Sequence, residues 1–157
     1  MTTFMIHDSP VGPLLLTTDG AGLTGLRFPP HDVGASWERG DAAFTDVVCQ
    51  LDEYFAGTRR QFDIPLHPTG TPFQLKVWEQ LHEIPYGETI SYGALARRVA
   101  SPNASRAVGL ANGRNPIAII IPCHRVIGAN GSLTGYGGGL DRKRFLLGLE
   151  VGADRLL

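Results

Sequence analysis

The sequence predicts an α/β protein in two parts, a sheet with one helix first and a mainly helical part second. Three short apolar segments, residues 3–6, 12–18 and 22–28, are separated by the turn signals Ser9-Pro10 and Asp19-Gly20. This pattern indicates an antiparallel meander. In the second half of the chain, apolar residues recur mostly at helical spacing. The sheet is therefore expected to come first and the helices second.

The first part continues with one helix. Apolar side chains repeat every three or four residues across residues 42–55, which predicts a helix with one apolar face. Gly57 is expected to close it. Cys49 lies off the centre of the apolar face, and its neighbours are acids, so we interpret it as structural. Residues 62–66 are expected to form an edge strand, where Pro65 is tolerated.

Composition sets the domain count and limits the function classes. A chain of 157 residues can bury a core without disulfides or metals. We expect an N-terminal α/β domain (1–67), a linker (68–72) and a C-terminal domain (73–157). Residues 1–70 carry four Lys or Arg and nine Asp or Glu, whereas residues 71–157 carry ten and six. The basic second half allows a nucleic-acid surface there.

Location and bound groups follow from the same composition. No apolar run approaches the ~20 residues that cross a bilayer, so we expect no membrane partner. Two cysteines far apart fit a reducing compartment, and the absence of a basic nuclear run favours a cytoplasmic protein. His7, His31 and His67 are scattered without ligand spacing. We therefore expect neither metal nor cofactor.

Four helices are expected in the second part: residues 73–84, residues 92–99 capped by Ser91, residues 104–112 and residues 140–151. The middle two, joined by a short connection, have the helix-turn-helix pattern. Residues 104–112 are mostly small, and Arg106 is the one large polar group. Small residues suit close, sequence-independent contact with a minor groove, but they equally suit tight packing in a core.

The stretch from Ile119 to Gly128 carries the chemistry. Its three isoleucines favour a buried strand, which Pro122 would end just before Cys123. His124 and the cation Arg125 follow at once, a setting in which a thiol becomes a thiolate. A lone cysteine is nevertheless often a small buried hydrophobe. Adjacent side chains on an extended segment also point to opposite faces.

The ordered set of motifs decides between these interpretations. Pro122-Cys123-His124-Arg125-Val126, preceded by Arg106-Ala107-Val108-Gly109 and Asn115-Pro116 and followed by residues 135–139, resembles the O6-alkylguanine-DNA alkyltransferase family. The match covers about residues 71–150. The resemblance implies a ribonuclease-H-like N-terminal domain and a winged helix-turn-helix C-terminal domain. It also implies irreversible, single-turnover transfer of an alkyl group from O6 of guanine, and from O4 of thymine, to Cys123.

The resemblance assigns a role to each candidate residue. Cys123 is the nucleophile and alkyl acceptor, His124 the base acting through a water, and Glu150 the acid that orients His124. Asn115 braces the site, and Tyr92 donates a proton to the base. Arg106 is the finger that fills the space of a flipped nucleotide. The DNA-binding set is Tyr92, Gly93, Ser101, Ala104, Ser105, Arg106, Gly109 and Ala129. The substrate-pocket set is Ala118, Val126, Tyr136 and Gly137. Without the resemblance, Arg106 and Glu150 would be surface charges.

The sequence departs from the family pattern at Gly137, where some members carry serine, and at Ala118, where others carry proline. The second change predicts an open pocket that accepts more than methyl. The expected partner is double-stranded DNA bearing O6-alkylguanine, bound in the minor groove without sequence preference. The protein is expected to be a monomer in isolation that can cluster on DNA. The alternatives are a non-reactive sensor of alkylated DNA, a helix-turn-helix regulator and a cysteine hydrolase.

Overall fold

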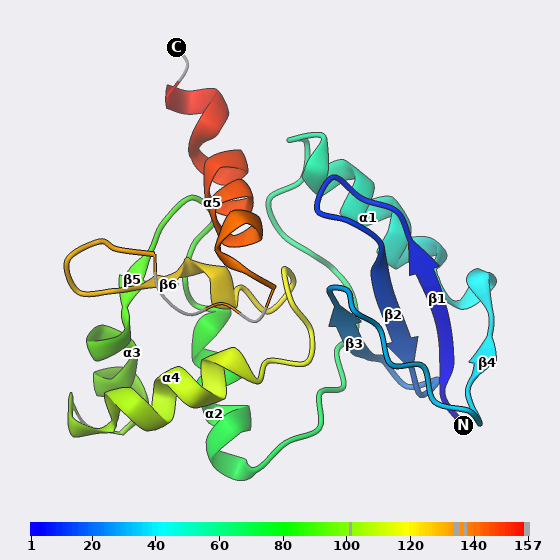
Figure 1. The fold of residues 1–157 in the computed structure, drawn as a ribbon, viewed down its shortest axis with the longest axis horizontal. Coiled ribbons are helices and arrows are strands. Elements are labelled where there is room, and N and C mark those ends of the chain that lie inside the picture. The colour runs from blue at the N-terminus through cyan, green and yellow to red at the C-terminus, as the bar shows by residue number, and fades with distance from the viewer. Residues whose placement is uncertain (101, 134–135, 137, 156–157) are drawn as a thin grey trace. The chain divides into compact units, whose positions relative to one another are not determined.

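The structure is a computed structural model, which describes residues 1–100, 102–133, 136 and 138–155. The chain forms two compact units, Met1–Thr69 and Gly70–Leu157, each described here by itself (Figure 1). Within the described residues, no helix has the length and the apolar content needed to cross a membrane.

The first unit is a four-stranded sheet with one long helix. Strands β1 (Thr3–His7), β2 (Leu14–Thr18) and β3 (Leu23–Arg27) form the predicted antiparallel meander. A short strand that the sequence did not predict, β4 (Glu38–Arg39), pairs parallel to β1 and gives the order β3-β2-β1-β4. The predicted strand over residues 62–66 is wrong, because only Leu66 forms an isolated bridge, to Leu23.

The predicted helix over residues 42–55 is present in two pieces, the 3-10 turn η1 (Asp41–Phe44) and helix α1 (Thr45–Phe55). Its buried side chains are Phe44, Val47, Leu51 and Tyr54, which fall at helical spacing on one face. Gly57 ends the helix with φ +81, and the amide of Thr58 donates to Glu53 O at 2.9 Å. Cys49 is a free, exposed cysteine on this helix.

The second unit is mainly helical. Helix α2 (Pro72–Leu81) starts with a capping box, in which Thr71 and Gln74 exchange hydrogen bonds between side chain and backbone. Helix α3 (Tyr92–Val99) follows β5 (Ile90–Ser91), and the Ser91 hydroxyl accepts from the amide of Ala94 at 3.0 Å, which confirms the predicted cap. The 3-10 turn η2 (Pro102–Ala104) leads into helix α4 (Ser105–Gly113).

Helices α2, α3 and α4 pack on one another, so α3 and α4 form the predicted helix-turn-helix against a third helix. The chain then makes the 3-10 turn η3 (Cys123–Arg125) and strand β6 (Val126–Ile127), which pairs parallel to β5. Helix α5 (Leu140–Arg155) ends the unit. In chain order, Cys123 therefore follows α4 and precedes α5. The α/β class, with the sheet first and the helices second, is as predicted.

Candidate active site

Two γ-turns and a 3-10 turn form the backbone of the site. The amide of Ile120 donates to Ala118 O at 2.8 Å around Ile119, which has φ +72. The amide of Cys123 donates to Ile121 O at 2.8 Å around Pro122, which has φ −82 and ψ 66. The predicted strand over the isoleucines is therefore wrong.

The isoleucines are nevertheless buried, each exposing 7 % of its surface or less. Their apolar burial is achieved in turns, and a positive φ at a β-branched residue is a strained conformation that the surrounding packing must hold. Strain of this kind is concentrated at functional sites. The turns also change the relation between the reactive side chains, because Cys123 and His124 lie in a 3-10 turn and not on an extended segment.

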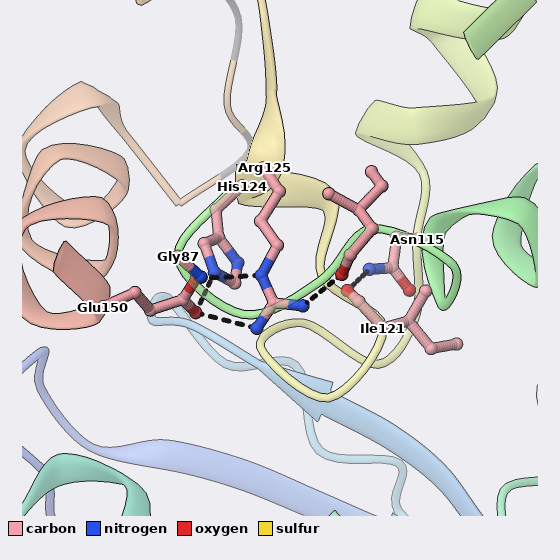
Figure 2. Close-up of polar contacts among 7 residues, drawn as sticks. Gly87, Asn115, Ile121, His124, Arg125 and Glu150 are labelled. Carbon is pink, nitrogen blue, oxygen red and sulfur yellow. Dashed lines mark hydrogen bonds and ion pairs between the residues drawn. The ribbon is translucent and has the colours of Figure 1, made fainter. Parts of the chain in front are cut away.

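Asn115 holds this loop from inside. Its Nδ2 donates to Ile121 O at 2.7 Å (Figure 2). Its Oδ1 accepts from the amide of Ile117 at 3.0 Å. Both ends of the carboxamide are therefore used within the loop that leads to Cys123. A side chain that could not both donate and accept would leave a backbone group in this loop without its partner.

Cys123 exposes only 5 % of its surface. Burial raises the pKa of its thiol, while hydrogen bonds from the side chains of Asn115 and Tyr136 and the positive charge of Lys143 act to lower that pKa. Because the burial effect is the largest, the resting group is a neutral thiol. A nucleophile in this state needs a base.

His124 is the base that the geometry offers. The imidazole is fully buried, and its Nε2 lies 2.7 Å from Glu150 Oε2 (Figure 2). Burial lowers the pKa of His124, against the raising effect of Glu150, so the ring is neutral at pH 7. An ionised carboxylate can only accept, so Nε2 carries the proton and Nδ1 is the basic atom. Nδ1 is buried without a hydrogen-bond partner among the described residues.

Arg125 does not act on the thiol as the sequence suggested. Its Nε lies 2.8 Å from Glu150 Oε1 and its Nη2 3.0 Å from Glu150 Oε2, a bidentate ion pair (Figure 2). Its Nη1 donates to Ile84 O at 2.7 Å, and the amide of Gly87 donates to Glu150 Oε1 at 3.3 Å. The guanidinium therefore fixes the carboxylate that orients His124.

The cation whose charge acts on the pKa of Cys123 is Lys143, which the sequence analysis missed. Its side chain is fully buried, and Nζ donates to Val126 O at 2.6 Å and lies 5.8 Å from the centre of the Tyr92 ring. Burial lowers the pKa of Lys143, and the charge of Cys123 acts to raise it. Lys143 precedes Glu150 by seven residues, two helical turns, so both lie on one face of α5. This seven-residue spacing is the sequence pattern from which Lys143 could have been identified as a site residue.

We expect the Lys143→Met variant to have a higher Cys123 pKa than the wild type, because the substitution removes the charge that favours the thiolate. The measurement is the pH dependence of alkylation of Cys123 by iodoacetamide, with the Cys49→Ser background used throughout. Lys76, the other lysine of the chain, is exposed on α2, so Lys76→Met is the matched control. An unchanged pH profile for Lys143→Met would contradict the assignment.

The ion-pair cluster makes stability depend on pH. Burial acts to raise the pKa of Glu150, but the hydrogen bonds and charges of His124 and Arg125 outweigh it and lower that pKa from 4.5 to about 2. A lowered pKa stabilises the fold above the unfolded value, and this contribution is lost as the pH falls from about 4.5 to about 2. The shift corresponds to about 3 kcal/mol.

The measurement for this prediction is the free energy of unfolding in urea, for wild type and Glu150→Gln, at intervals from pH 7 to pH 2. The gap between the two proteins should be largest at pH 7 and should close over the acidic interval, because the protonated carboxyl is as neutral as the amide. A gap that stays constant with pH would show that the charge of Glu150 contributes nothing to stability.

The residues predicted to bind DNA lie mostly on the helix-turn-helix. Tyr92 and Gly93 open α3, Ala104 ends η2, Ser105, Arg106 and Gly109 lie on α4, and Ala129 follows β6. Arg106 is exposed. A Cβ built on Gly109 would lie 3.7 Å from the Tyr92 ring, an ordinary van der Waals distance, so α4 lies against the Tyr92 ring at this position. Ser101 lies outside the described residues.

Three of the four predicted pocket residues lie in the part of the chain that the structure describes. Val126 and Ala118 are buried, and the carbonyl groups of both accept hydrogen bonds, from Lys143 and from the amide of Ile120. The Tyr136 side chain acts to lower the pKa of Cys123. Gly137 lies outside the described residues. In the part of the chain that the structure describes, no three His, Cys, Asp or Glu side chains gather to hold a metal ion.

Comparison with known proteins finds matches over most of the chain. The family model for the 6-O-methylguanine DNA methyltransferase ribonuclease-like domain matches residues 2–68, and that for the DNA binding domain of the same family matches residues 72–152. A methylated-DNA--protein-cysteine methyltransferase of Methanosarcina acetivorans is 54 % identical over 151 residues, covering 94 % of this chain and 97 % of that protein. One of Mycobacterium tuberculosis is 56 % identical over 153 residues, covering 93 % of each.

A solved structure points the same way. The crystal structure of Mycobacterium tuberculosis OGT in complex with DNA is 54 % identical, with a TM-score of 0.91, and the match covers 96 % of this chain and 93 % of that one. These similarities extend over both units and confirm the resemblance that the motifs around Cys123 indicated. The chain therefore belongs to the 6-O-methylguanine DNA methyltransferase family.

Proposed function

We propose that the protein repairs alkylated DNA directly, by irreversible transfer of an alkyl group from O6 of guanine to Cys123. The observation that carries the proposal is a buried cysteine next to a neutral histidine whose Nε2 proton is held by Glu150. The curated relatives are named methylated-DNA--protein-cysteine methyltransferases, and this name describes the same reaction. The acceptor group is then part of the protein, so each chain reacts once.

The proposed reaction is a displacement at the alkyl carbon. His124 Nδ1 takes the thiol proton through a water, and Glu150 stabilises the imidazolium that forms. The Cys123 sulfur then bonds to the alkyl carbon as the bond from that carbon to guanine O6 breaks, and the electron pair stays on the base. The Tyr92 hydroxyl donates a proton to the base, which leaves as guanine. Lys143, close to the Tyr92 ring, favours the negative charge that this donation leaves behind.

DNA binding is assigned to the helix-turn-helix, with α4 in the minor groove. Arg106 is the one polar side chain among the exposed residues of α4, beside Ala107, Leu110 and Gly113, which supports contact without base-specific readout. In this proposal the lesion is flipped out of the duplex and Arg106 fills its space, since a planar cation can stack on bases and donate to the orphaned partner. Repair at O4 of thymine follows the same geometry. Both cysteines are free thiols, which supports action in the cytoplasm.

Replacing Arg106 should separate base flipping from chemistry. Flipping costs a few kcal/mol, so we expect Arg106→Ala to slow transfer from duplex DNA by about 10²-fold. Transfer from the free O6-alkylated guanine base needs no flipping and should keep its wild-type rate. Arg106→Lys keeps the charge but loses the planar group, and it should restore only a small part of the loss. Equal slowing with duplex and free base would contradict this role.

The test of the proposed function is the stoichiometry of lesion loss. A duplex containing one O6-methylguanine is mixed with increasing amounts of protein, and the remaining lesion is measured after digestion of the DNA. The proposal predicts one lesion removed per chain and none on further incubation. Lesion that stays intact although the DNA is bound would indicate a sensor, and continuous turnover would indicate a hydrolase.

A further inference from the structure

Asn112 is a buried polar side chain with no part in the reaction described above. It lies in the last turn of α4 and exposes 2 % of its surface. Its Oδ1 has no hydrogen-bond partner among the residues that the structure describes. A buried amide that is only half satisfied destabilises a fold relative to an apolar side chain of the same shape. Packing alone therefore does not explain an asparagine at this position.

The other end of the Asn112 amide contacts the nucleophile's own residue. Nδ2 donates to Cys123 O at 3.3 Å, a buried hydrogen bond between positions 11 residues apart. The same carbonyl accepts the amide of Val126, but that bond is local to the 3-10 turn. The bond from Asn112 instead comes from α4, so it ties the second helix of the helix-turn-helix to Cys123.

The side chains of Asn112 and Asn115 form hydrogen bonds with different parts of the structure. Both ends of Asn115 bond within the loop, to Ile117 and Ile121, so it holds the loop together internally. Asn112 bonds to the same loop from helix α4. Its partner, Cys123, follows Pro122, whereas Ile121, the partner of Asn115, precedes it. The loop is therefore fixed in its own shape by one asparagine and fixed relative to α4 by the other.

The end of α4 that carries Asn112 is itself anchored. The indole Nε1 of Trp78, on α2, donates to Ala111 O at 2.9 Å, and Ala111 is buried. Arg106 lies six residues before Asn112, about 9 Å along the helix axis. One rigid helix thus carries the exposed arginine near one end and the contact to Cys123 at the other.

We propose that Asn112 is a positioning residue that keeps Cys123 in register with α4. A nucleotide seated against α4 then presents its alkyl carbon in line with the Cys123 sulfur. The inference rests on the proposed function, since it concerns alignment for that transfer. Alignment has a large effect on such reactions, because a displacement of about 1 Å can slow a reaction by about 10²-fold.

The test is the Asn112→Leu variant, which removes the donor and the unpartnered acceptor while keeping a similar volume. With saturating duplex containing O6-methylguanine, its single-turnover rate constant should fall about 10- to 100-fold. Its Kd for the duplex and its rate of Cys123 alkylation by iodoacetamide should both stay close to wild type. Iodoacetamide is the critical readout, because this small reagent needs an accessible thiolate but no alignment with α4.

A second variant and a control complete the design. Asn112→Asp keeps the shape but turns an acceptor toward the Cys123 carbonyl, so it should be slowed at least as much as the leucine variant. Thr71→Val removes the capping hydrogen bond at the start of α2, which involves neither α4 nor Cys123, and it should lower the melting temperature at an unchanged rate constant.

Three results would overturn the inference: a wild-type rate constant in both Asn112 variants, an equal loss of iodoacetamide reactivity and transfer, or equal slowing in Thr71→Val. The wild-type protein is assayed alongside. If it transfers no methyl group, the proposed function itself fails, and this failure is distinguishable from the loss of alignment in a variant.

Discussion

Replacing Cys123 by serine is expected to abolish alkyl transfer while leaving the fold and DNA binding intact. A hydroxyl is a far weaker nucleophile than a thiolate at neutral pH, and the loss of a nucleophile from such a site is on the order of 10⁴-fold or more. The side chains are nearly isosteric, and Cys123 makes no covalent cross-link in this structure. The measurements are lesion removal, duplex affinity and melting temperature.

Cys49→Ser is the matched control for this prediction. Cys49 is an exposed thiol on α1, in the other compact unit, and its replacement should leave transfer at the wild-type rate. Residual lesion removal by Cys123→Ser would contradict the assignment of the nucleophile. If Cys49→Ser were the inactive variant instead, this result would contradict the assignment of the active site to Cys123 and His124.

Replacing Glu150 by glutamine should give the largest loss of stability in this unit. The guanidinium of Arg125 cannot be deprotonated, so the variant buries a cation whose charged partner is gone. Breaking a buried ion pair in this way typically costs about 3–5 kcal/mol, which corresponds to a fall in melting temperature of more than about 10 °C for a unit of this size. Differential scanning calorimetry measures this directly.

The same variant should also lose activity. An amide can present a donor to the His124 ring, so the tautomer with a basic Nδ1 is no longer enforced, and the imidazolium loses its counter-charge. Loss of such an orienting carboxylate slows related reactions by about 10²- to 10⁴-fold. Asp141→Asn, an exposed acid of α5 paired with Arg144 at 3.1 Å, is the control and should match wild type in both measurements. A stable and active Glu150→Gln protein would contradict the role of the cluster.

Elements whose pattern is local could be predicted from the sequence. The meander over β1, β2 and β3 and the capped helix α3 follow from turn residues, apolar period and the Ser91 hydroxyl. β4 was missed because two exposed residues that pair with a distant strand leave no periodic signal. The predicted strand at residues 62–66 failed because an apolar segment ending in a single bridge has the same local pattern as a strand.

The site could be predicted less completely, because it depends on side chains that meet in three dimensions. The motif around Cys123 named the nucleophile, but an apolar run of isoleucines is compatible with either a strand or a set of buried turns. Arg125 does not have its expected role, because it pairs with Glu150. The cation whose charge acts on the pKa of Cys123 is Lys143 on α5, for which the sequence predicted no role. Asn112 gave no signal, since its partner is a backbone carbonyl 11 residues away.

The most direct test of the central claim is the intact mass of the protein after reaction with an excess of duplex DNA containing O6-methylguanine, followed by peptide mapping. The proposed transfer predicts a gain of one methyl group per chain, about 14 Da, located on the peptide that contains Cys123 and constant on longer incubation. No gain in mass, a second adduct, or a methyl group on Cys49 in place of Cys123 would contradict the account.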